Sequence, residues 1–290
     1  MWNADIPRAL VLGATGRTGA AVVKTLEATA GQAVPVRASR SKATVEQWNE
    51  EGEEAVRIDL DDPDTFPGAL EGIDRVFLMP GYTSAMNHQT KTLVDAAEDA
   101  GVGFLVHLGV FSDGRSTDPH FAWHELVERY IAGSKLAWAN VHPHVFMENL
   151  LGVNRLRDGQ MVWPMGDKQV GWIANDDIAA VVAKVLAEGP KTHAGEDHYL
   201  SAALGREIPA LVLTPDDLQR MIDAGLNTAP ANMDATYAAS TLTWARQNYE
   251  GRMDYSAVTT STVQDLLGRE PIHLDSWATT HRQELLDQLP

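Results

Sequence analysis

The sequence predicts an α/β fold, a Rossmann-type doubly wound parallel sheet with a smaller, mostly helical C-terminal lobe. Three observations support this prediction. Short apolar, β-branched runs alternate with helical-period stretches through the first half of the chain, which is typical of strands connected by helices. The runs are apolar throughout, as expected of strands buried on both faces. A glycine-rich segment joins the first run to the first helical stretch.

The elements of the first half follow the order that such a sheet requires. Apolar runs are the expected strands, and amphipathic stretches between them are the expected helices. The strands are residues 8–13, 33–39, 75–79, 104–110 and 137–141. The helices are residues 17–30, 43–52, 84–100 and 121–133. A further short strand ends at Asp59.

Helical patterns dominate the second half. Residues 175–189 form a helix that Asn175 or Asp176 can cap. Residues 214–225 form another, with Thr214 as its N-cap. The remaining helical patterns cover residues 231–250 and 273–289. These segments predict a lobe that packs on the edge of the sheet.

The composition excludes several classes of function. The chain has 290 residues, with 40 acidic and 23 basic side chains and a formal net charge of −17. Such a surface repels phosphate backbones and anionic membranes, so we expect no nucleic-acid and no membrane partner. The absence of cysteine excludes thiolate nucleophiles and disulfides. No secretion signal and no long apolar run is found, so we expect a cytoplasmic protein.

The glycine-rich segment is the sharpest local signal. Gly13, Gly16 and Gly19 are spaced GxxGxxG, directly after the first expected strand and at the start of the first helix. In this context Gly13 permits a tight turn, Gly16 lets the backbone approach a pyrophosphate, and Gly19 lets the helix pack on the strand. Exposed amides at the helix end would hold the anion. A glycine turn that binds nothing is the alternative, and the flanking strand and helix favour the dinucleotide.

The end of the second strand indicates which dinucleotide. An NAD site has an acid there for the ribose hydroxyls, but this segment has none. Arg40 suits a 2′-phosphate, and Ser39, Lys42 and Arg17 can add donors. We therefore expect NADP(H) in preference to NAD(H), with a solvated basic loop as the alternative.

Two further segments are candidates for cofactor contacts. Asp59 can accept a hydrogen bond from the adenine amino group or, equally well, cap the following turn. Met79, Pro80 and Gly81 follow a strand and are expected beneath the cofactor, at the carboxyl edge of the sheet.

Four segments, in order, resemble the NmrA-like family of atypical short-chain dehydrogenases/reductases. They are LVLGATGRTG, AVRIDLDDPDTFPGALEGIDRVFLMP, HFAWHELVERYIAGSKLAWANVHPHVFMENLL and WIANDDIAAVVAKVL, and the resemblance spans about residues 6–200. It implies an NADP-binding Rossmann domain, here residues 1–150, and a C-terminal substrate lobe, residues 151–290, whose last strands can return to the sheet. Some members reduce quinones, triphenylmethane dyes or azo dyes with NADPH, and others only sense the cofactor.

The resemblance also assigns residues. The family loop corresponds to Gly13, Thr15, Gly16, Arg17, Thr18 and Gly19, and the loop near the nicotinamide to Pro80, Gly81 and Tyr82. The family's HxxxK pattern falls on His120 and His124, and its RPxxFMEN stretch begins at His142 and Pro143. Histidines therefore replace a lysine at 124 and an arginine at 142. Residues 199–215 are shorter than the family norm, so a helix can be missing there.

The sequence offers several candidates for chemistry. No tyrosine is followed four residues later by lysine, so ordinary alcohol–ketone chemistry is not supported. His124, and after it His120, can donate a proton near neutral pH, with a partly exposed helical histidine pair as the alternative. This HxxxH pair lacks an obvious third ligand, so we expect no metal. Tyr82 and Ser112 can orient an acceptor, and His142 with Pro143 can flank the nicotinamide. The residues that can line an apolar substrate pocket are Trp123, Phe146 and Met147.

We therefore expect an NADPH-dependent reductase without flavin or metal, acting as a monomer or homodimer. Its acceptor would be a small aromatic or quinonoid molecule: an azo dye, a quinone or a triarylmethane dye. An electron-poor conjugated acceptor needs positioning and stacking more than a strong acid. The alternative is an NADP(H)-sensing regulatory protein without turnover, and an isomerase ranks last because it also needs the Tyr/Lys pair.

Overall fold

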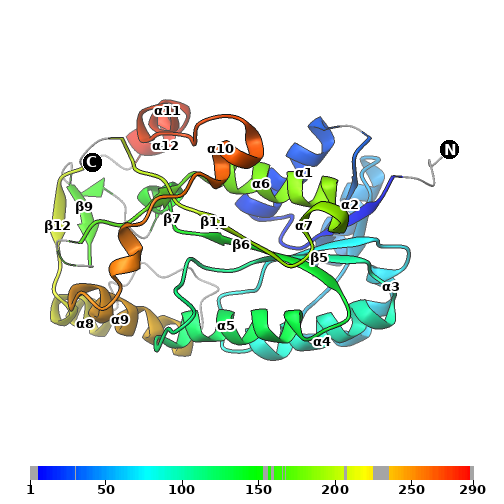
Figure 1. Cartoon of the computed structure of the whole chain (residues 1–290), viewed down its shortest axis with the longest axis horizontal. Helices are drawn as coiled ribbons and strands as arrows, with labels where there is room; N and C mark the ends of the chain where they lie inside the picture. The colour runs from blue at the N-terminus through cyan, green and yellow to red at the C-terminus, as the bar shows by residue number, and fades with distance from the viewer. Residues whose placement is uncertain are drawn as a thin grey trace.

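A seven-stranded sheet, parallel throughout, forms the centre of the molecule (Figure 1). The computed structural model describes residues 6–29, 31–152, 156–157, 160–164, 166, 168–205, 208–224 and 235–287. The strand order is β11-β6-β5-β4-β1-β2-β3. The strands are β1 (Arg8–Val11), β2 (Val34–Ser39), β3 (Ala55–Arg57), β4 (Arg75–Leu78), β5 (Phe104–Leu108), β6 (Ala137–Pro143) and β11 (Glu196–Leu200). The predicted doubly wound parallel sheet is confirmed.

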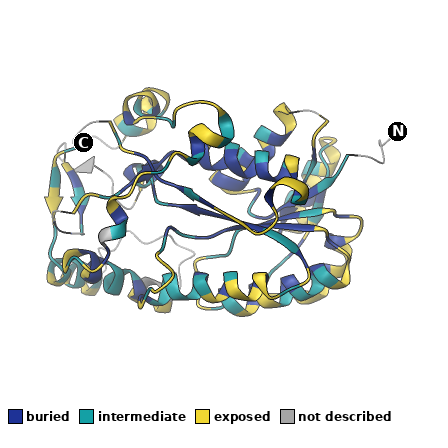
Figure 2. Ribbon diagram, viewed as in Figure 1, coloured by how far each residue is buried: buried dark blue, intermediate teal, exposed yellow. Residues whose placement is uncertain are grey.

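Helices cover both faces of this sheet. On one face lie α1 (Arg17–Ala28) and α6 (Asn175–Glu188), and on the other α4 (Met86–Asp99) and α5 (Pro119–Ala132) (Figure 1). Two separate apolar cores result, because the strands send side chains to both faces. Figure 2 shows the buried strands between helices whose outer faces are exposed. The shorter elements beside them are α2 (Lys42–Glu50), the 3₁₀ turn η1 (Pro63–Thr65), α3 (Phe66–Leu70) and α7 (Pro190–His193).

Two elements beyond residue 150 belong to the central layers. The apolar side of α6 packs against α1 and the sheet, with Ile178, Val182 and Val185 fully buried in the first core. β11 pairs in parallel with β6 and forms one edge of the sheet. The strand therefore returns to the sheet, and the helix, which the sequence placed in the second lobe, completes a helical layer.

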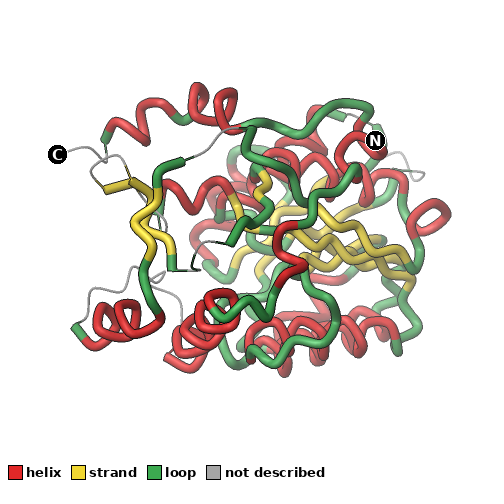
Figure 3. The backbone as a smooth tube through the Cα atoms, turned by 60° about the vertical axis from the view of Figure 1, so that its left-hand side comes forward, coloured by secondary structure: helices red, strands yellow, loops and turns green. Residues whose placement is uncertain are grey.

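The other C-terminal elements form a smaller body beside the sheet (Figure 3). It contains a two-stranded sheet of β7 (Val145–Phe146) and β10 (Trp172–Ile173), and a three-stranded sheet of β8 (Leu156–Arg157), β9 (Gln160–Trp163) and β12 (Ala210–Val212). Its helices are α8 (Pro215–Asp223), α9 (Ala235–Tyr249), α11 (Leu274–Thr280) and α12 (Arg282–Leu286). The short helix α10 (Thr262–Leu267) packs instead against α6 and β11, with Val263 in the first core. The 3₁₀ turns η2 (Met147–Leu151) and η3 (Asp254–Ala257) connect these elements. Buried Trp163, Trp172 and Trp277 hold a third core there.

The helix caps show where local sequence signals were sufficient. Thr214 caps α8 as predicted, because its hydroxyl accepts a hydrogen bond from Asp217 N at 3.1 Å while the Asp217 carboxylate accepts from Thr214 N at 2.9 Å. The helix predicted over residues 175–189 is present as α6, but its predicted N-cap was wrong, because Ala174 is the N-cap and Asn175 and Asp176 are already helical. The predicted helix 273–289 is divided into α11 and α12 at His281. Predicted helical residues 231–234 and 288–289 lie outside the described residues.

Among the described residues, no helix has the length and apolar character needed to cross a membrane.

Candidate functional site

The glycine-rich segment forms a tight turn between β1 and α1. Gly13 has φ +70°, in the left-handed region that favours glycine, and its carbonyl accepts a hydrogen bond from Gly16 N at 2.8 Å. A Cβ atom at residue 19 would lie 2.8 Å from Ala14 N and overlap the Gly13 carbonyl group. Gly13 and Gly19 are thus both required by geometry, one by backbone conformation and the other by close approach of the helix to the turn.

The N-terminus of α1 is open to solvent. Thr15, Gly16 and Arg17 are all exposed at the turn. Among the described residues, no side chain caps this helix and no acid lies in its first turn. The first amides of a helix lack intrahelical partners, and the helix dipole adds positive potential there. The turn therefore fits a pyrophosphate, which would take these amides as hydrogen-bond donors.

Thr18, the next residue of the predicted loop, faces inward. It is 8% exposed, and its hydroxyl donates a hydrogen bond to Oδ1 of Asn175 at 2.7 Å. This bond explains why Asn175 does not cap its own helix: its side chain joins α6 to α1. The side chain of Thr18 therefore joins α1 to α6 in the interior of the protein.

The turn lies at the switch point of the sheet. β1 lies between β2 and β4. The chain continues from β1 to β2 and β3 on one side, and then crosses to β4 on the other side, where the remaining strands of the sheet follow. Ligands of open α/β sheets bind at such a point, at the carboxyl ends of the strands. Met79, directly after β4, packs against Gly13 so closely that a side chain at residue 13 would collide with it. The loops after β1 and β4 therefore lie against each other, and the place of Met79, Pro80 and Gly81 beneath a cofactor stays a prediction.

The predicted basic cluster follows β2. Arg40 is exposed, and its carbonyl accepts a hydrogen bond from Arg57 Nε at 3.3 Å. Lys42 is 80% exposed and 3.6 Å from Glu46, and Arg17 lies 3.5 Å from Glu284. Ser39 is buried, and its hydroxyl accepts from Ser41 N at 3.2 Å. The cationic side chains are thus accessible to an anion, whereas the Ser39 hydroxyl serves the turn before α2.

Asp59 lies two residues beyond β3 in a tight turn. Its side chain accepts a hydrogen bond from Asp61 N at 3.2 Å, and its own N–H donates to Thr65 at 3.0 Å. This geometry matches the turn-capping alternative. A second carboxylate oxygen remains for other partners, so the adenine contact stays a prediction.

The loop after β4 continues from Met79 through Pro80 and Gly81 to Tyr82. Pro80 and Gly81 are partly exposed, and Tyr82 is 46% exposed. The Tyr82 side chain is therefore accessible to solvent, and its role in orienting an acceptor stays a prediction.

The predicted histidine pair on α5 belongs to a cluster of imidazoles, in which His124 is buried and His120 is half-buried. The ring centroid of His124 lies 5.0 Å from that of His120 and 5.6 Å from that of His107 on β5. Burial, and then the neighbouring histidines, lower the pKa of His124 well below its usual value, and burial lowers the pKa of His120 to about 3. Both rings are therefore neutral at neutral pH, which removes the physical basis for using either as a cationic proton donor.

A different histidine, His142, has its pKa raised and not lowered. His142, near the end of β6, lies with Nε2 3.0 Å from Oδ1 of Asp197 and with Nδ1 3.0 Å from the Val110 carbonyl and 3.5 Å from Glu128. Burial alone would lower the pKa of His142, but the hydrogen bond to Asp197 and the charge of Glu128 raise it overall. Burial raises the pKa of Glu128 itself to about 7. Tyr199 stacks on the His142 ring at 4.5 Å between centroids.

The sequence did not reveal this arrangement. Asp197 comes from β11, and Glu128 faces inward from α5. Neither residue lies in a local motif, and only the pairing of β11 with β6 brings Asp197 to His142. The predicted cofactor residue His142 is 3% exposed, and Pro143 is the last residue of β6 and accepts a main-chain hydrogen bond from Phe111 N at 3.1 Å.

The other substrate candidates have largely structural contacts. The Ser112 hydroxyl donates to Glu125 at 2.9 Å and accepts from Gly114 N at 3.0 Å, which orders the loop after β5. Trp123 and Phe146 are partly buried against the cores, and Met147 is fully buried in the third core. In this structure Met147 packs in the interior and does not line a pocket.

The MEN segment after β7 has a clear structural role. Glu148 is buried and accepts hydrogen bonds from Asn175 N at 3.0 Å and from the Trp277 indole at 2.7 Å. A carboxylate at the N-terminus of α6 complements the helix dipole. This residue therefore connects α6 to α11 and fixes the C-terminal body against the sheet.

The sheet order, the crossover next to β1 and the glycine turn define a Rossmann-type α/β protein. The chain belongs to the NmrA-like family, whose model matches residues 7–205. The resemblance read from the sequence is thus confirmed.

Individual relatives extend over nearly the whole chain. The NAD(P)H azoreductase of Xenophilus azovorans is 29% identical over 291 residues, covering 94% of this chain and 97% of the relative. A Citrobacter sp. triphenylmethane reductase complexed with NADP(H) has a TM-score of 0.76 at 17% identity, covering 95% and 99%. The Escherichia coli NADPH-dependent quinone oxidoreductase complexed with NADPH has a TM-score of 0.76 at 20% identity, with the same coverages. These structures share the fold of this chain.

Proposed function

We propose that this chain is an NADPH-dependent reductase that transfers hydride to an electron-poor conjugated acceptor, such as an azo dye, a quinone or a triarylmethane dye. One observation carries the proposal: the uncapped N-terminus of α1 behind a turn that only glycine can form at residues 13 and 19. The names of the azoreductase, triphenylmethane reductase and quinone oxidoreductase relatives support the same reaction class.

The cofactor would be held by main-chain groups of the turn. The amides of Thr15 and Arg17 are at the exposed end of α1, where a diphosphate gains hydrogen bonds and a favourable dipole, while the Gly16 amide donates to the Gly13 carbonyl within the turn. When bound there, the reduced nicotinamide supplies the hydride. The loop Met79–Tyr82, whose first residue packs against Gly13 of the turn, would support the other half of the dinucleotide.

The basic side chains after β2 would select the phosphorylated form. Arg40 is exposed near the end of β2, and Lys42 and Arg17 offer two further cations. A guanidinium pairs with a phosphate through parallel hydrogen bonds, which NADH cannot provide at this position. The proposed order of preference is therefore NADPH before NADH.

The proton that accompanies the hydride would come from solvent or from Tyr82, not from the α5 histidines. His120 and His124 are neutral because of their burial. Their rings can still polarise an acceptor by hydrogen bonding, which does not require a charged imidazole. Tyr82 is exposed beside the cofactor loop and has a hydroxyl to orient the acceptor.

An acceptor panel tests the proposal. Purified protein would be mixed with NADPH and with azo dyes, quinones and triarylmethane dyes, without added flavin, and the nicotinamide absorbance would be followed. We expect acceptor-dependent oxidation of NADPH and, for the dyes, loss of colour in step with it. A matched sample with the Gly19→Ala variant should show neither.

Cofactor binding measured by calorimetry on the same samples separates the alternatives. Tight binding of NADPH without acceptor-dependent oxidation across the panel would overturn the reductase proposal in favour of a cofactor sensor. No binding of NADPH or NADP⁺ by the folded protein would overturn the cofactor site as well.

A further inference from the structure

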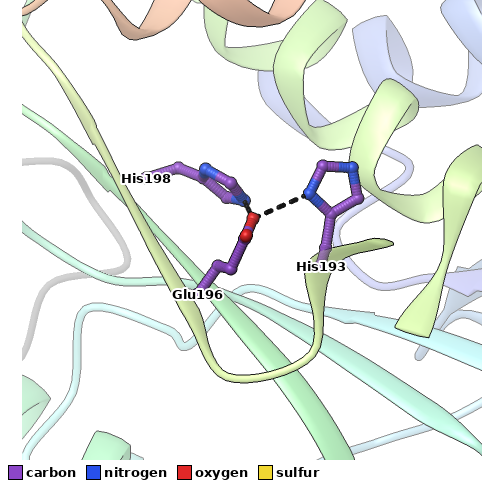
Figure 4. A group of neighbouring side chains, drawn as sticks. All are labelled: His193, Glu196 and His198. Atoms are coloured by element: carbon purple, nitrogen blue, oxygen red, sulfur yellow. Dashed lines mark hydrogen bonds and ion pairs between the residues drawn. The ribbon is translucent and has the colours of Figure 1, made fainter. Parts of the chain in front are cut away.

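Three side chains converge at the start of the edge strand β11. Nδ1 of His193 lies 3.1 Å from Oε2 of Glu196, and Nε2 of His198 lies 3.5 Å from the same oxygen. The donor atoms of all three residues lie within 4.8 Å of one another. Figure 4 shows both imidazole rings directed at the carboxylate.

Local structure explains this convergence. His193 is the last residue of α7, and Gly195, with φ +79°, turns the chain into β11. Glu196 and His198 are two positions apart on the strand and therefore lie on one face. The side chains of His193 and His198 are 2% and 8% exposed, whereas that of Glu196 is 49% exposed. The group is thus a largely buried pair of imidazoles with one carboxylate open to solvent.

The nitrogens of the two rings have an unusual set of neighbours. Nε2 of His193 lies 2.8 Å from the Glu188 carboxylate, at the end of α6. When Nε2 donates its hydrogen to Glu188, the lone pair of Nδ1 points at Glu196, and two acceptors then face each other. Within the described part of the chain, Nε2 of His198 has no hydrogen-bond partner although it is buried. A cation placed between the three donors would satisfy all of them.

We propose that His193, Glu196 and His198 bind a divalent transition-metal ion of the zinc type. Two imidazoles and one carboxylate are a common zinc ligand set, and a fourth position stays open for water. With metal–ligand bonds of about 2.0–2.1 Å, tetrahedral ligands lie about 3.4 Å apart. The separations of 3.1 and 3.5 Å fall near this value. Glu188 is the carboxylate that orients a metal-binding histidine from outside the ligand shell.

This site is separate from the proposed cofactor site. The glycine turn follows the carboxyl end of β1, whereas Glu196 is at the amino end of β11 in the same parallel sheet. The ion would therefore take no part in hydride transfer. It would anchor the edge strand, which also carries Asp197 to its hydrogen bond with His142.

The test uses the full-length protein without a histidine tag, freed of metal by dialysis against a chelator. Zinc chloride would be titrated by calorimetry, and cobalt(II) chloride by its visible ligand-field absorption. We expect one zinc per chain, a tetrahedral cobalt spectrum and a higher melting temperature with zinc. His198→Asn and Glu196→Gln should each weaken zinc binding at least about tenfold.

Two more variants serve as controls for misfolding and for zinc binding at surface histidines. Glu188→Gln leaves all three ligands in place and should weaken zinc binding about tenfold through His193 alone. His88→Gln, at an exposed histidine of α4, should leave the affinity unchanged. The proposal is overturned if the wild-type protein takes up no zinc at micromolar concentrations, or if His198→Asn and Glu196→Gln, with melting temperatures close to wild type in the absence of metal, bind zinc as well as it does.

Discussion

His142 and Asp197, 55 positions apart, form a hydrogen-bonded ion pair between β6 and the edge strand β11, with 3.0 Å between Nε2 and Oδ1. Asn140 Nδ2 donates to the same carboxylate oxygen at 2.9 Å. The His142 ring is nearly fully buried, while the Asp197 side chain is 43% exposed. The pair thus couples the last strand of the sheet to the segment that the family resemblance placed beside the nicotinamide.

The stability that this pair provides should depend on pH in a defined window. The pKa of His142 is raised, so its contribution is complete below the unfolded pKa near about 6.5 and is lost as pH rises through the folded value. The hydrogen bond from His142 lowers the pKa of Asp197, so its contribution is complete above about pH 4 and is lost as pH falls through the folded value. Both partners are charged between these limits.

Asp197→Asn should therefore cost most in mildly acidic solution. We expect a loss of about 1 kcal/mol near pH 5.5, a modest value because solvent screens the exposed carboxylate, and a smaller loss near about pH 9. Urea unfolding at both pH values measures it, with the exposed Asp99→Asn on α4 as the control. A cost that does not change between the two pH values would show that His142 is not the titrating partner.

Local sequence signals were enough to predict the elements that are held by contacts between residues close together in the sequence. The turn at residues 13–19 and the capping box of α8 are encoded by adjacent residues, and both are present. The alternation of apolar runs with helical stretches correctly indicated the parallel sheet. Where a side chain serves a distant partner, the same reasoning failed. Asparagine is a residue type that commonly caps helices, but the side chain of Asn175 accepts a hydrogen bond from Thr18, 157 positions away.

The same distinction applies to the features of the candidate site. The accessible turn and Arg40 could be read from spacing and charge. The protonation states of the histidines could not, because they depend on burial and on neighbours from other strands, as with His107 beside His124. The spacing His-x-x-Glu-x-His at residues 193–198 can be seen in the sequence. The sequence alone does not show that the turn between α7 and β11 brings the three side chains together.

Gly19 is the residue of the turn least able to accept a side chain. A Cβ atom at this position would overlap the Gly13 carbonyl, which is backbone and cannot rotate away. We expect Gly19→Ala to lose at least about 1–3 kcal/mol of stability and to bind NADPH poorly, because overpacking moves α1 away from the turn. Gly68→Ala, where a Cβ meets nothing within 4 Å on α3, is the control and should be neutral or slightly stabilising. Thermal unfolding and calorimetric binding of both variants provide the comparison, and equal behaviour of the two would contradict the role given to Gly19.

Arg40 should decide between the two nicotinamide cofactors. Its side chain is exposed, and its carbonyl accepts a hydrogen bond from Arg57. Arg40→Ala should therefore change stability by less than about 0.5 kcal/mol. Loss of a charged hydrogen-bond partner costs about 1.5–3 kcal/mol, so we expect NADPH affinity to fall roughly 10- to 150-fold while NADH affinity hardly changes. Arg115→Ala, at an exposed arginine in the loop after β5, controls for the general loss of positive charge. Calorimetric titration with both nucleotides measures the ratio, and equal losses for NADPH and NADH would remove the case for 2′-phosphate recognition at this position.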